Sequence, residues 1–238
     1  MLEKKNISSV LKSVEKPGRY IGGEYNRVVK NREDVKCRFA FCFPDTYEIG
    51  MSNLGVRILY DVLNRDNDIW CERVYAPWED MKTKMEEYSI PLSAVESGDP
   101  LSAFDIVAFS LQYELCYTTA LQMIKLAGFP LRSKDRGEDY PLVIGGGPCV
   151  FNSEPVADFF DLMNIGEGEE VLLEICHLYS KMKANGTYTK SAFLHAATKI
   201  EGVYVPSLYD VTYNDDGTIK EYKPLYDDVP TKIKKRIV

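Results

Sequence analysis

Histidine is nearly absent from this sequence, with only His177 and His195 among 238 residues. Neither belongs to an HExxH motif, and no nucleophile elbow or other local pairing of a nucleophile with a base occurs. Both histidines fall in segments expected to be helical, where a packed or solvated imidazole is the favoured interpretation. The sequence therefore predicts no catalytic residue and no metal ligand.

Long apolar segments are missing as well. No stretch of 18 apolar residues exists, which argues against a membrane-spanning helix, and the charged first 20 residues lack the apolar core of a signal peptide. The six cysteines are dispersed without a CxxC pair, and several sit in apolar runs, so buried free thiols in a reducing compartment are expected. These features predict a soluble cytoplasmic protein with no membrane partner.

Positive charge is in the minority, because 29 Lys and Arg face 36 Asp and Glu for a net charge of −7. This balance makes nucleic acid an unexpected partner for the domain as a whole. One basic run, Lys232 to Arg236, is interpreted as part of a solvated linker. The chain also lacks a GxGxxG or P-loop motif after its first apolar run, so neither type of nucleotide site is expected.

The sequence does contain an alternation of apolar runs with helical stripes. Residues 37–44 and 104–112 are continuous apolar runs, typical of strands buried on both faces. Leu54, Ile58 and Val62 lie at helical spacing and predict a helix that buries this stripe. The alternation of strands and helices along the chain predicts an α/β fold, with a doubly wound parallel sheet of the cobalamin-binding or flavodoxin-like type. Further strands are expected at 70–76, 90–97, 141–147 and 159–166, and further helices at 6–14, 78–89, 114–128 and 169–186.

The last part of the chain has a different pattern. Residues 202–225 alternate and carry Asp215-Asp216-Gly217 between two strand-like runs, which predicts a small antiparallel β appendage. The expected division of the chain is an N-terminal helix and arm (1–35), an α/β domain (36–186), a helix plus β-hairpin appendage (187–225) and a linker (226–238).

The candidate binding residues lie in the loops beyond the carboxyl ends of the strands, where open parallel sheets bind their ligands. The triple glycine after residue 144 suits either a tight turn or the close approach of a ligand. The carboxylates around Glu167 suit the start of a helix and would repel a phosphate. The candidates, in chain order, are Asp45, Tyr47, Gly50, Ser110, Gln112, Gly145, Gly146, Gly147 and Glu167.

In their order these loops resemble the fingerprint of cobalamin-binding domains. Asp45 and Gly50 stand in register with the Asp-x-His-x-x-Gly element, and Ser110 and the triple glycine stand where the later Ser-x-Leu and Gly-Gly elements belong. Tyr47 replaces the histidine that ligates cobalt from below in that family. The resemblance therefore implies cobalamin bound without a histidine lower ligand, or a degenerate cobalamin site.

Longer segments resemble the N-terminal region of a largely uncharacterised family of radical S-adenosylmethionine (radical SAM) proteins. That family carries a CxxxCxxC motif for a 4Fe–4S cluster that binds S-adenosylmethionine, and the motif is absent from this sequence. The resemblance thus implies an accessory domain that docks on a radical SAM barrel following the linker 226–238. The matching segments are KPGRYIGGEYN, FPDTYEIGMSNLGVRILYDVLN, FSLQYEL, DRGEDYPLVIGGGPCVFNSEP and NIGEGEEVL.

Two alternatives remain open at this point. The same fold, without a cofactor, would serve as an interaction module that positions a macromolecular substrate. A stand-alone transferase that binds a nucleotide is the third hypothesis, and it would need an acid or base beside the loops.

Overall fold

The computed structural model describes residues 7–238, so the first residue of the helix expected at 6–14 lies outside the described residues. The expected helix is short and breaks into a 3-10 turn after Val10. The strands are β1 (Cys37–Phe43), β2 (Ile69–Tyr75), β3 (Ile106–Ser110), β4 (Leu142–Gly146), β5 (Leu162–Asn164), β6 (Val203–Tyr204), β7 (Tyr209–Tyr213) and β8 (Ile219–Pro224). The helices are α1 (Ile7–Val10), α2 (Tyr47–Ser52), α3 (Leu54–Arg65), α4 (Glu79–Tyr88), α5 (Cys116–Leu126), α6 (Val171–Ala184) and α7 (Lys190–Ala197).

One six-stranded sheet organises the fold, in the order β2-β1-β3-β4-β5-β6. The first five strands pair in parallel, and β6 adds an antiparallel edge to β5. Every residue of β1, β2 and β3 is buried. The continuous apolar runs predict this for β1 and β3, whereas β2 also buries Glu72 and Arg73. The order 2-1-3-4-5 is that of flavodoxin-like sheets, so the predicted fold class is confirmed.

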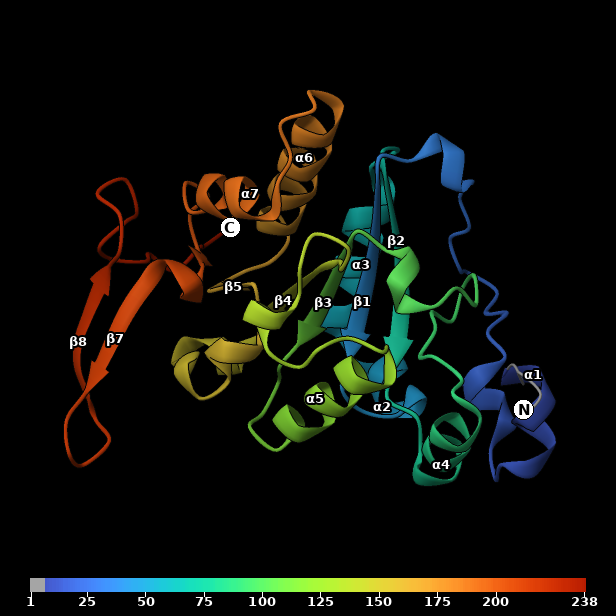
Figure 1. The fold of residues 1–238 in the computed structure, drawn as a ribbon. Helices are drawn as coiled ribbons and strands as arrows, with labels where there is room; N and C mark the ends of the chain where they lie inside the picture. The colour runs from blue at the N-terminus through green and yellow to red at the C-terminus, as the bar shows by residue number, and fades with distance from the viewer. Residues whose placement is uncertain (1–6) are drawn as a thin grey trace.

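Helices cover both faces of the sheet. In Figure 1, α3 and α6 lie behind the strands, whereas α5 crosses in front of them. The hairpin of β7 and β8 projects on the left of the same view, and the N-terminal segment with α1 lies beside α4 on the right. The separate antiparallel pair β7–β8 confirms the predicted appendage.

The stripe predicted for α3 is wrong, although the helix itself is confirmed. Asn53 begins the helix by accepting a hydrogen bond from the Val56 amide at 3.0 Å. The residues that face the core are Val56, Tyr60 and Leu63, while Leu54 is 65% exposed. This helix has apolar residues on more than one face. On the core side, the Tyr60 hydroxyl oxygen accepts a hydrogen bond from the Val28 amide at 2.7 Å.

The strand predicted at 90–97 is also wrong. This segment is a loop that makes one backbone hydrogen bond to the sheet, from the Val95 amide to the Arg73 carbonyl at 2.9 Å. Pro91 has no amide to donate, which interrupts a ladder at that point. The loop and the N-terminal arm instead cover the exposed edge of β2, and the Trp70 indole donates to the Val28 carbonyl of the arm at 3.2 Å.

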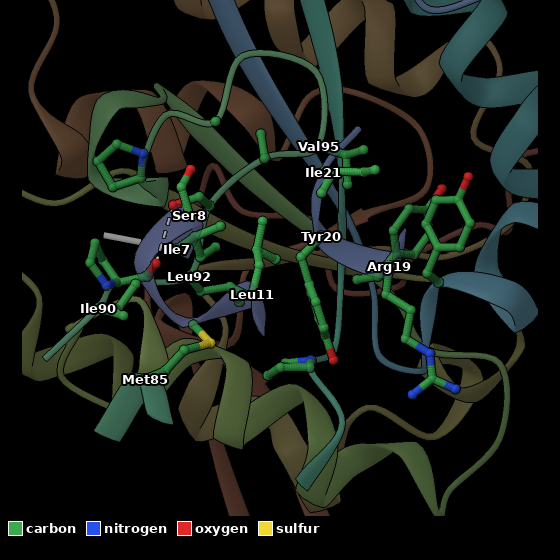
Figure 2. Close-up of a pocket in the computed structure, with 18 of the residues that line it drawn as sticks. Ile7, Ser8, Leu11, Arg19, Tyr20, Ile21, Met85, Ile90, Leu92 and Val95 are labelled. Atoms are coloured by element: carbon green, nitrogen blue, oxygen red, sulfur yellow. Dashed lines mark hydrogen bonds between the residues drawn. The ribbon is translucent and has the colours of Figure 1, made fainter. Parts of the chain in front are cut away.

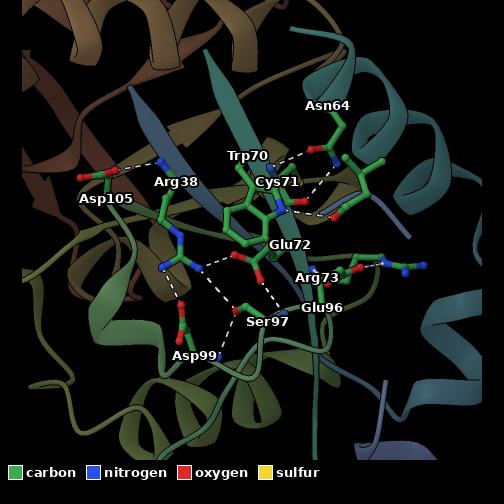
Figure 3. Close-up of polar contacts among 11 residues, drawn as sticks. Arg38, Asn64, Trp70, Cys71, Glu72, Arg73, Glu96, Ser97, Asp99 and Asp105 are labelled. Carbon is green, nitrogen blue, oxygen red and sulfur yellow. Dashed lines mark hydrogen bonds and ion pairs between the residues drawn. The ribbon is translucent and has the colours of Figure 1, made fainter. Parts of the chain in front are cut away.

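A buried ion pair between β1 and the edge strand β2 is connected to the chain just after this loop. Arg38 on β1 and Glu72 on β2 are 3% and 0% exposed and pair directly (Figure 3). The Arg38 guanidinium lies between the rings of Trp70 and Phe104, at 4.8 and 4.3 Å from their centroids. It also contacts Asp99 at 2.8 Å, so the pair fastens the loop that carries Asp99 to the sheet.

The C-terminal part returns to the main sheet before and after the hairpin. Phe193 of α7 is fully buried in the same core, and β6 extends the sheet. After β8 the chain buries Val229 and then pairs Arg236 with Gly166 beside β5. Across residues 7–238, no helix combines the length and apolar character needed to cross a bilayer.

Candidate functional site

A cavity of about 200 Å³ opens at the carboxyl ends of β1, β3, β4 and β5, between the sheet and the starts of α3 and α6. Its apolar walls include Phe41, Leu59, Ile144 and Leu172. Its rim is built from glycines and from polar side chains that follow the strands. This is the edge at which flavodoxin-like sheets bind their ligands, and we call this cavity the glycine cleft.

Most of the candidate residues line the glycine cleft. The Gln112 side-chain amide donates to the Ser110 hydroxyl at 2.6 Å, so these two side chains form one polar unit at the end of β3. Glu167 borders the opposite side, just before α6. The candidates that the fold brings together here are Ser110, Gln112, Gly145, Gly146, Gly147 and Glu167.

The glycines of this cleft serve two different needs. Gly147 has φ +99° and ψ 179°, and a Cβ there would lie 2.7 Å from the Leu111 carbonyl oxygen, so the turn requires glycine. At Gly146 the nearest atom to a Cβ would be 3.9 Å away. Gly146 therefore leaves open space in the cleft that a side chain would fill. The turn interpretation is confirmed at Gly147, and the close approach of a ligand at Gly146 stays a prediction.

Asn164, the last residue of β5, lines the cleft and was missed by the sequence reasoning. The residue is 4% exposed, and its Oδ1 has no hydrogen-bond partner among the described residues. Burying an unpaired amide oxygen costs about 1–3 kcal/mol. An asparagine that ends a short buried strand just before a Gly-x-Gly loop is the signal that could have identified it.

Asp45 and Gly50 do not reach the glycine cleft, although they follow β1. Asp45 accepts hydrogen bonds from the Tyr113 hydroxyl at 2.8 Å and from the Thr46 amide at 2.7 Å. The bond with Asp45 raises the pKa of Tyr113 to about 12. Gly50 lies under the Tyr75 ring, where a Cβ would collide with it. These residues link loops and pack helix α2, and the structure gives them no shared cavity with Ser110.

Tyr47 faces away from the glycine cleft as well. Its ring packs edge-on against Tyr75, with 5.5 Å between centroids. Burial and the neighbouring Glu24 carboxylate raise the pKa of Tyr47, which disfavours a phenolate. Tyr47 is therefore placed neither to enter the cleft nor to act as an anionic metal ligand there.

The cavity that Tyr47 does border lies between the N-terminal arm and the loop after α4. Its volume is about 540 Å³. Figure 2 shows apolar side chains such as Leu11, Ile21 and Leu92 around it. Its charged groups are already paired, because Arg19 contacts Glu48 at 2.8 Å and Glu96 contacts Arg73 at 2.6 Å. It offers a ligand no unpaired charge.

A third cavity, of about 680 Å³, lies beside the amino end of β4 and the hairpin. Its buried cations are Arg136 and Lys190, and both are held by Asp161, at 3.2 and 3.1 Å. These contacts join the loops before β4 and β5 to α7. In this cavity the Arg136 Nε has no hydrogen-bond partner among the described residues, although both terminal nitrogens of that guanidinium are bonded. In the glycine cleft the atom without a partner is the Asn164 Oδ1.

No group of three or more His, Cys, Asp or Glu side chains in the described part of the chain is arranged to hold a metal ion. His177 lies on the surface, 2.7 Å from Asp66. His195 packs edge-on against Tyr226, with 4.6 Å between centroids. All six cysteines fall within the described residues, and all are buried and free of disulfide bonds, as expected.

The sheet order and the position of the cleft define a flavodoxin-like domain with a glycine-lined cleft at its carboxyl edge. The family model described as radical SAM proteins, N-terminal, matches residues 55–206. This match covers more than half of the chain, and the chain belongs to that family. An uncharacterised protein of Methanocaldococcus jannaschii is 27% identical over 154 residues. The aligned segment is 63% of this chain and 28% of that protein. No solved structure matches the chain.

Proposed function

We propose that this chain is an accessory domain of a radical SAM protein and that its glycine cleft binds the nucleotide tail of a cobalamin without a protein lower ligand. The observation that carries the proposal is Asn164, a buried amide without a partner in a cavity lined by glycines. An unsatisfied buried group in a ligand-binding edge calls for an explanation, and a ligand supplies the missing hydrogen bond.

The size of the cleft supports binding of the tail rather than the whole cofactor. An apolar cavity of roughly 150 Å³ holds one benzene ring. The glycine cleft, at about 200 Å³, suits the bicyclic benzimidazole that ends the cobalamin tail. The corrin is too large for this space and would lie outside it. Ser110, Gln112 and Asn164 are the side chains that would hydrogen-bond the nucleotide.

The position of Tyr47 supports cobalt without a protein ligand from below. Its side chain packs on Tyr75 outside the cleft, and its pKa is raised rather than lowered. A bound cobalamin would supply cobalt-centred methyl or electron transfer chemistry to the parent protein. The role of this chain's own residues would be to bind and orient the tail.

A titration of the purified chain with hydroxocobalamin tests the proposal. We expect a saturable change in the visible spectrum and a matching calorimetric heat. Cobinamide, which lacks the nucleotide tail, should bind at least about tenfold more weakly, a difference of about 1.4 kcal/mol. Absence of any spectral change and heat would refute cobalamin binding, and equal affinity for cobinamide would refute the role given to the cleft.

Asn164→Leu is expected to separate binding from folding. The substitution removes an unpaired buried amide at similar volume, so the free energy of unfolding should stay level or rise by about 1 kcal/mol. Affinity for hydroxocobalamin should fall about tenfold, since the amide no longer bonds the ligand. Asn185→Leu, at the exposed end of α6, is the matched control and should change neither value. A clear loss of stability with unchanged affinity would assign Asn164 to the fold.

The proposed partner is a radical SAM domain in the same polypeptide, which would carry the 4Fe–4S cluster and S-adenosylmethionine. The family of this chain supports such a partner. Exposed apolar side chains gather in the segments that follow β1, β3 and β4, and they would form the docking surface. They are Ile49, Leu54, Tyr113, Leu115 and Phe151, and Leu115 is 84% exposed.

Positive charge on this apolar docking surface should weaken docking in a protein that contains both domains. We expect Leu115→Lys with Phe151→Lys to reduce interdomain cross-links and to speed proteolysis between the domains. Leu131→Lys, on an exposed residue before β4, is the control because it lies at the amino ends of the strands. If Leu115→Lys with Phe151→Lys left the interdomain cross-links unchanged, the partner would lie on another face.

The second candidate function is a cofactor-free module that positions a macromolecular substrate. The same exposed apolar surface favours it, because Leu115 is 84% and Phe151 58% exposed. The titration separates the two functions. The interaction module would be selected if neither hydroxocobalamin nor cobinamide binds, and if the Leu115→Lys and Phe151→Lys variant still weakens a macromolecular contact.

A further inference from the structure

The last residues of the chain pack against the loop 165–168, and residues 166–168 of that loop line the glycine cleft. The Arg236 amide donates to the Ile165 carbonyl at 3.0 Å, and the Glu167 amide donates to the Arg236 carbonyl at 3.2 Å. The Val238 amide donates to the Glu167 carboxylate at 2.5 Å. Residues 234–238, which we call the clasp, therefore pair with the loop that borders the cleft.

Gly166 is the residue that permits this pairing. Its φ is +117°, and a Cβ at this position would lie 2.6 Å from the Arg236 nitrogen. Gly166, Glu167 and Gly168 all line the cleft. One face of this loop thus touches the clasp while the loop also borders the ligand space.

The Arg236 side chain anchors the clasp through a set of carboxylates. Its guanidinium contacts Glu170 at 2.5 Å and Glu174 at 2.8 Å, both at the start of α6, and Glu201 at 3.8 Å before β6. The side chain is 18% exposed. Without this cation the carboxylates would repel one another at the start of α6, and the loop before that helix would lose its outer support.

We propose that Arg236 is a positioning residue for the glycine cleft and that the clasp and the loop 166–168 order together, so that a ligand in the cleft and the closed clasp stabilise each other. Such coupling is reciprocal by linkage. The ligand part of this inference rests on the proposed function. The chain beyond residue 236 would then be held in one direction more firmly when the cleft is filled than when it is empty.

Hydrogen exchange of the purified chain tests the clasp without any ligand. In Arg236→Ala, the amides of residues 165–168 and 236–238 should exchange at least about tenfold faster, while the urea midpoint of the whole domain stays unchanged. Arg236→Lys keeps the charge but not the fork geometry and should give an intermediate rate. Lys234→Ala, an exposed cation of the same segment, is the control and should leave these amides protected. Equal exchange in Arg236→Ala and Lys234→Ala would overturn the clasp.

Hydroxocobalamin tests the coupling. At saturation it should slow exchange of residues 236–238 about tenfold in the unmodified chain, and Arg236→Ala should lower its affinity about tenfold. Normal binding with unchanged exchange would refute the coupling and leave the cofactor proposal intact. If hydroxocobalamin does not bind, the cofactor proposal and the ligand coupling both fail, and the role of Arg236 in ordering the loop is decided by the exchange of the unliganded variants.

Discussion

Arg38→Met is expected to lower the free energy of unfolding by about 3–5 kcal/mol, because it leaves the buried Glu72 carboxylate without its cation. Glu72 is fully buried on β2, and its nearest cation is Arg38 on the neighbouring strand. The loss also removes the guanidinium from between the Trp70 and Phe104 rings. Urea unfolding followed by circular dichroism measures the change.

The control for this prediction is Arg65→Met. Arg65 pairs with Asp61 at 2.6 Å, but the two side chains are 77% and 57% exposed. Exposed pairs of this kind contribute about 0–1 kcal/mol, so this variant should stay close to the unmodified protein. If both variants lost the same small amount, the Arg38–Glu72 pair would not be holding the loop of Asp99 to the sheet.

The buried pair also marks a limit of the sequence reasoning. The run CRFAFCFP predicts a buried strand despite its arginine, and β1 confirms it. That run does not predict the ion-pair partner of Arg38. Glu72 is 34 positions away, and the parallel pairing of β1 with β2 brings the two side chains together. Burial pattern is local information, whereas ion pairing across strands depends on register.

The error on α3 has a related cause. The spacing of Leu54 and Ile58 fits a helix, yet the side that carries Val56 and Tyr60 is the one that packs on the sheet. When a helix has apolar residues on several faces, periodicity alone does not select the buried one. The choice follows from neighbours such as the arm residue Val28, whose amide donates to the Tyr60 hydroxyl.

The candidate site residues were chosen from the order of the loops that follow the strands, and not from the chemistry of each side chain. The rule that ligands lie beyond the carboxyl ends of parallel strands brought Ser110, Gly146 and Glu167 to one cleft. The same rule grouped Tyr47 with them, but α2 turns this side chain toward Tyr75. Asn164 was missed because its importance depends on the absence of a partner, which only the packed structure reveals.

Gly147→Ala is expected to destabilise the domain by roughly 3 kcal/mol or more, since its backbone region is essentially restricted to glycine and the strain there costs about 1–3 kcal/mol before any clash is counted. The clash is with Leu111, whose carbonyl oxygen would lie 2.7 Å from the new Cβ. That carbonyl also accepts from the Cys149 amide at 3.1 Å, so relief of the clash would disturb the turn after β4. Urea unfolding measures the loss.

The same substitution one residue earlier should have the opposite outcome. Gly146→Ala places a methyl group with 3.9 Å to its nearest neighbour, and alanine is no worse than glycine in a strand, so the free energy of unfolding should change by less than about 1 kcal/mol. The methyl group enters the space proposed for the benzimidazole, so affinity for hydroxocobalamin should fall at least about tenfold, whereas Gly18→Ala, which meets no atom within 4 Å and lies outside the cleft, should leave it unchanged. Equal stability of Gly147→Ala and Gly146→Ala would show that the turn does not need its glycine. Unaltered binding in Gly146→Ala would move the ligand away from the cleft, because a group filling that space could not tolerate an added side chain at its wall.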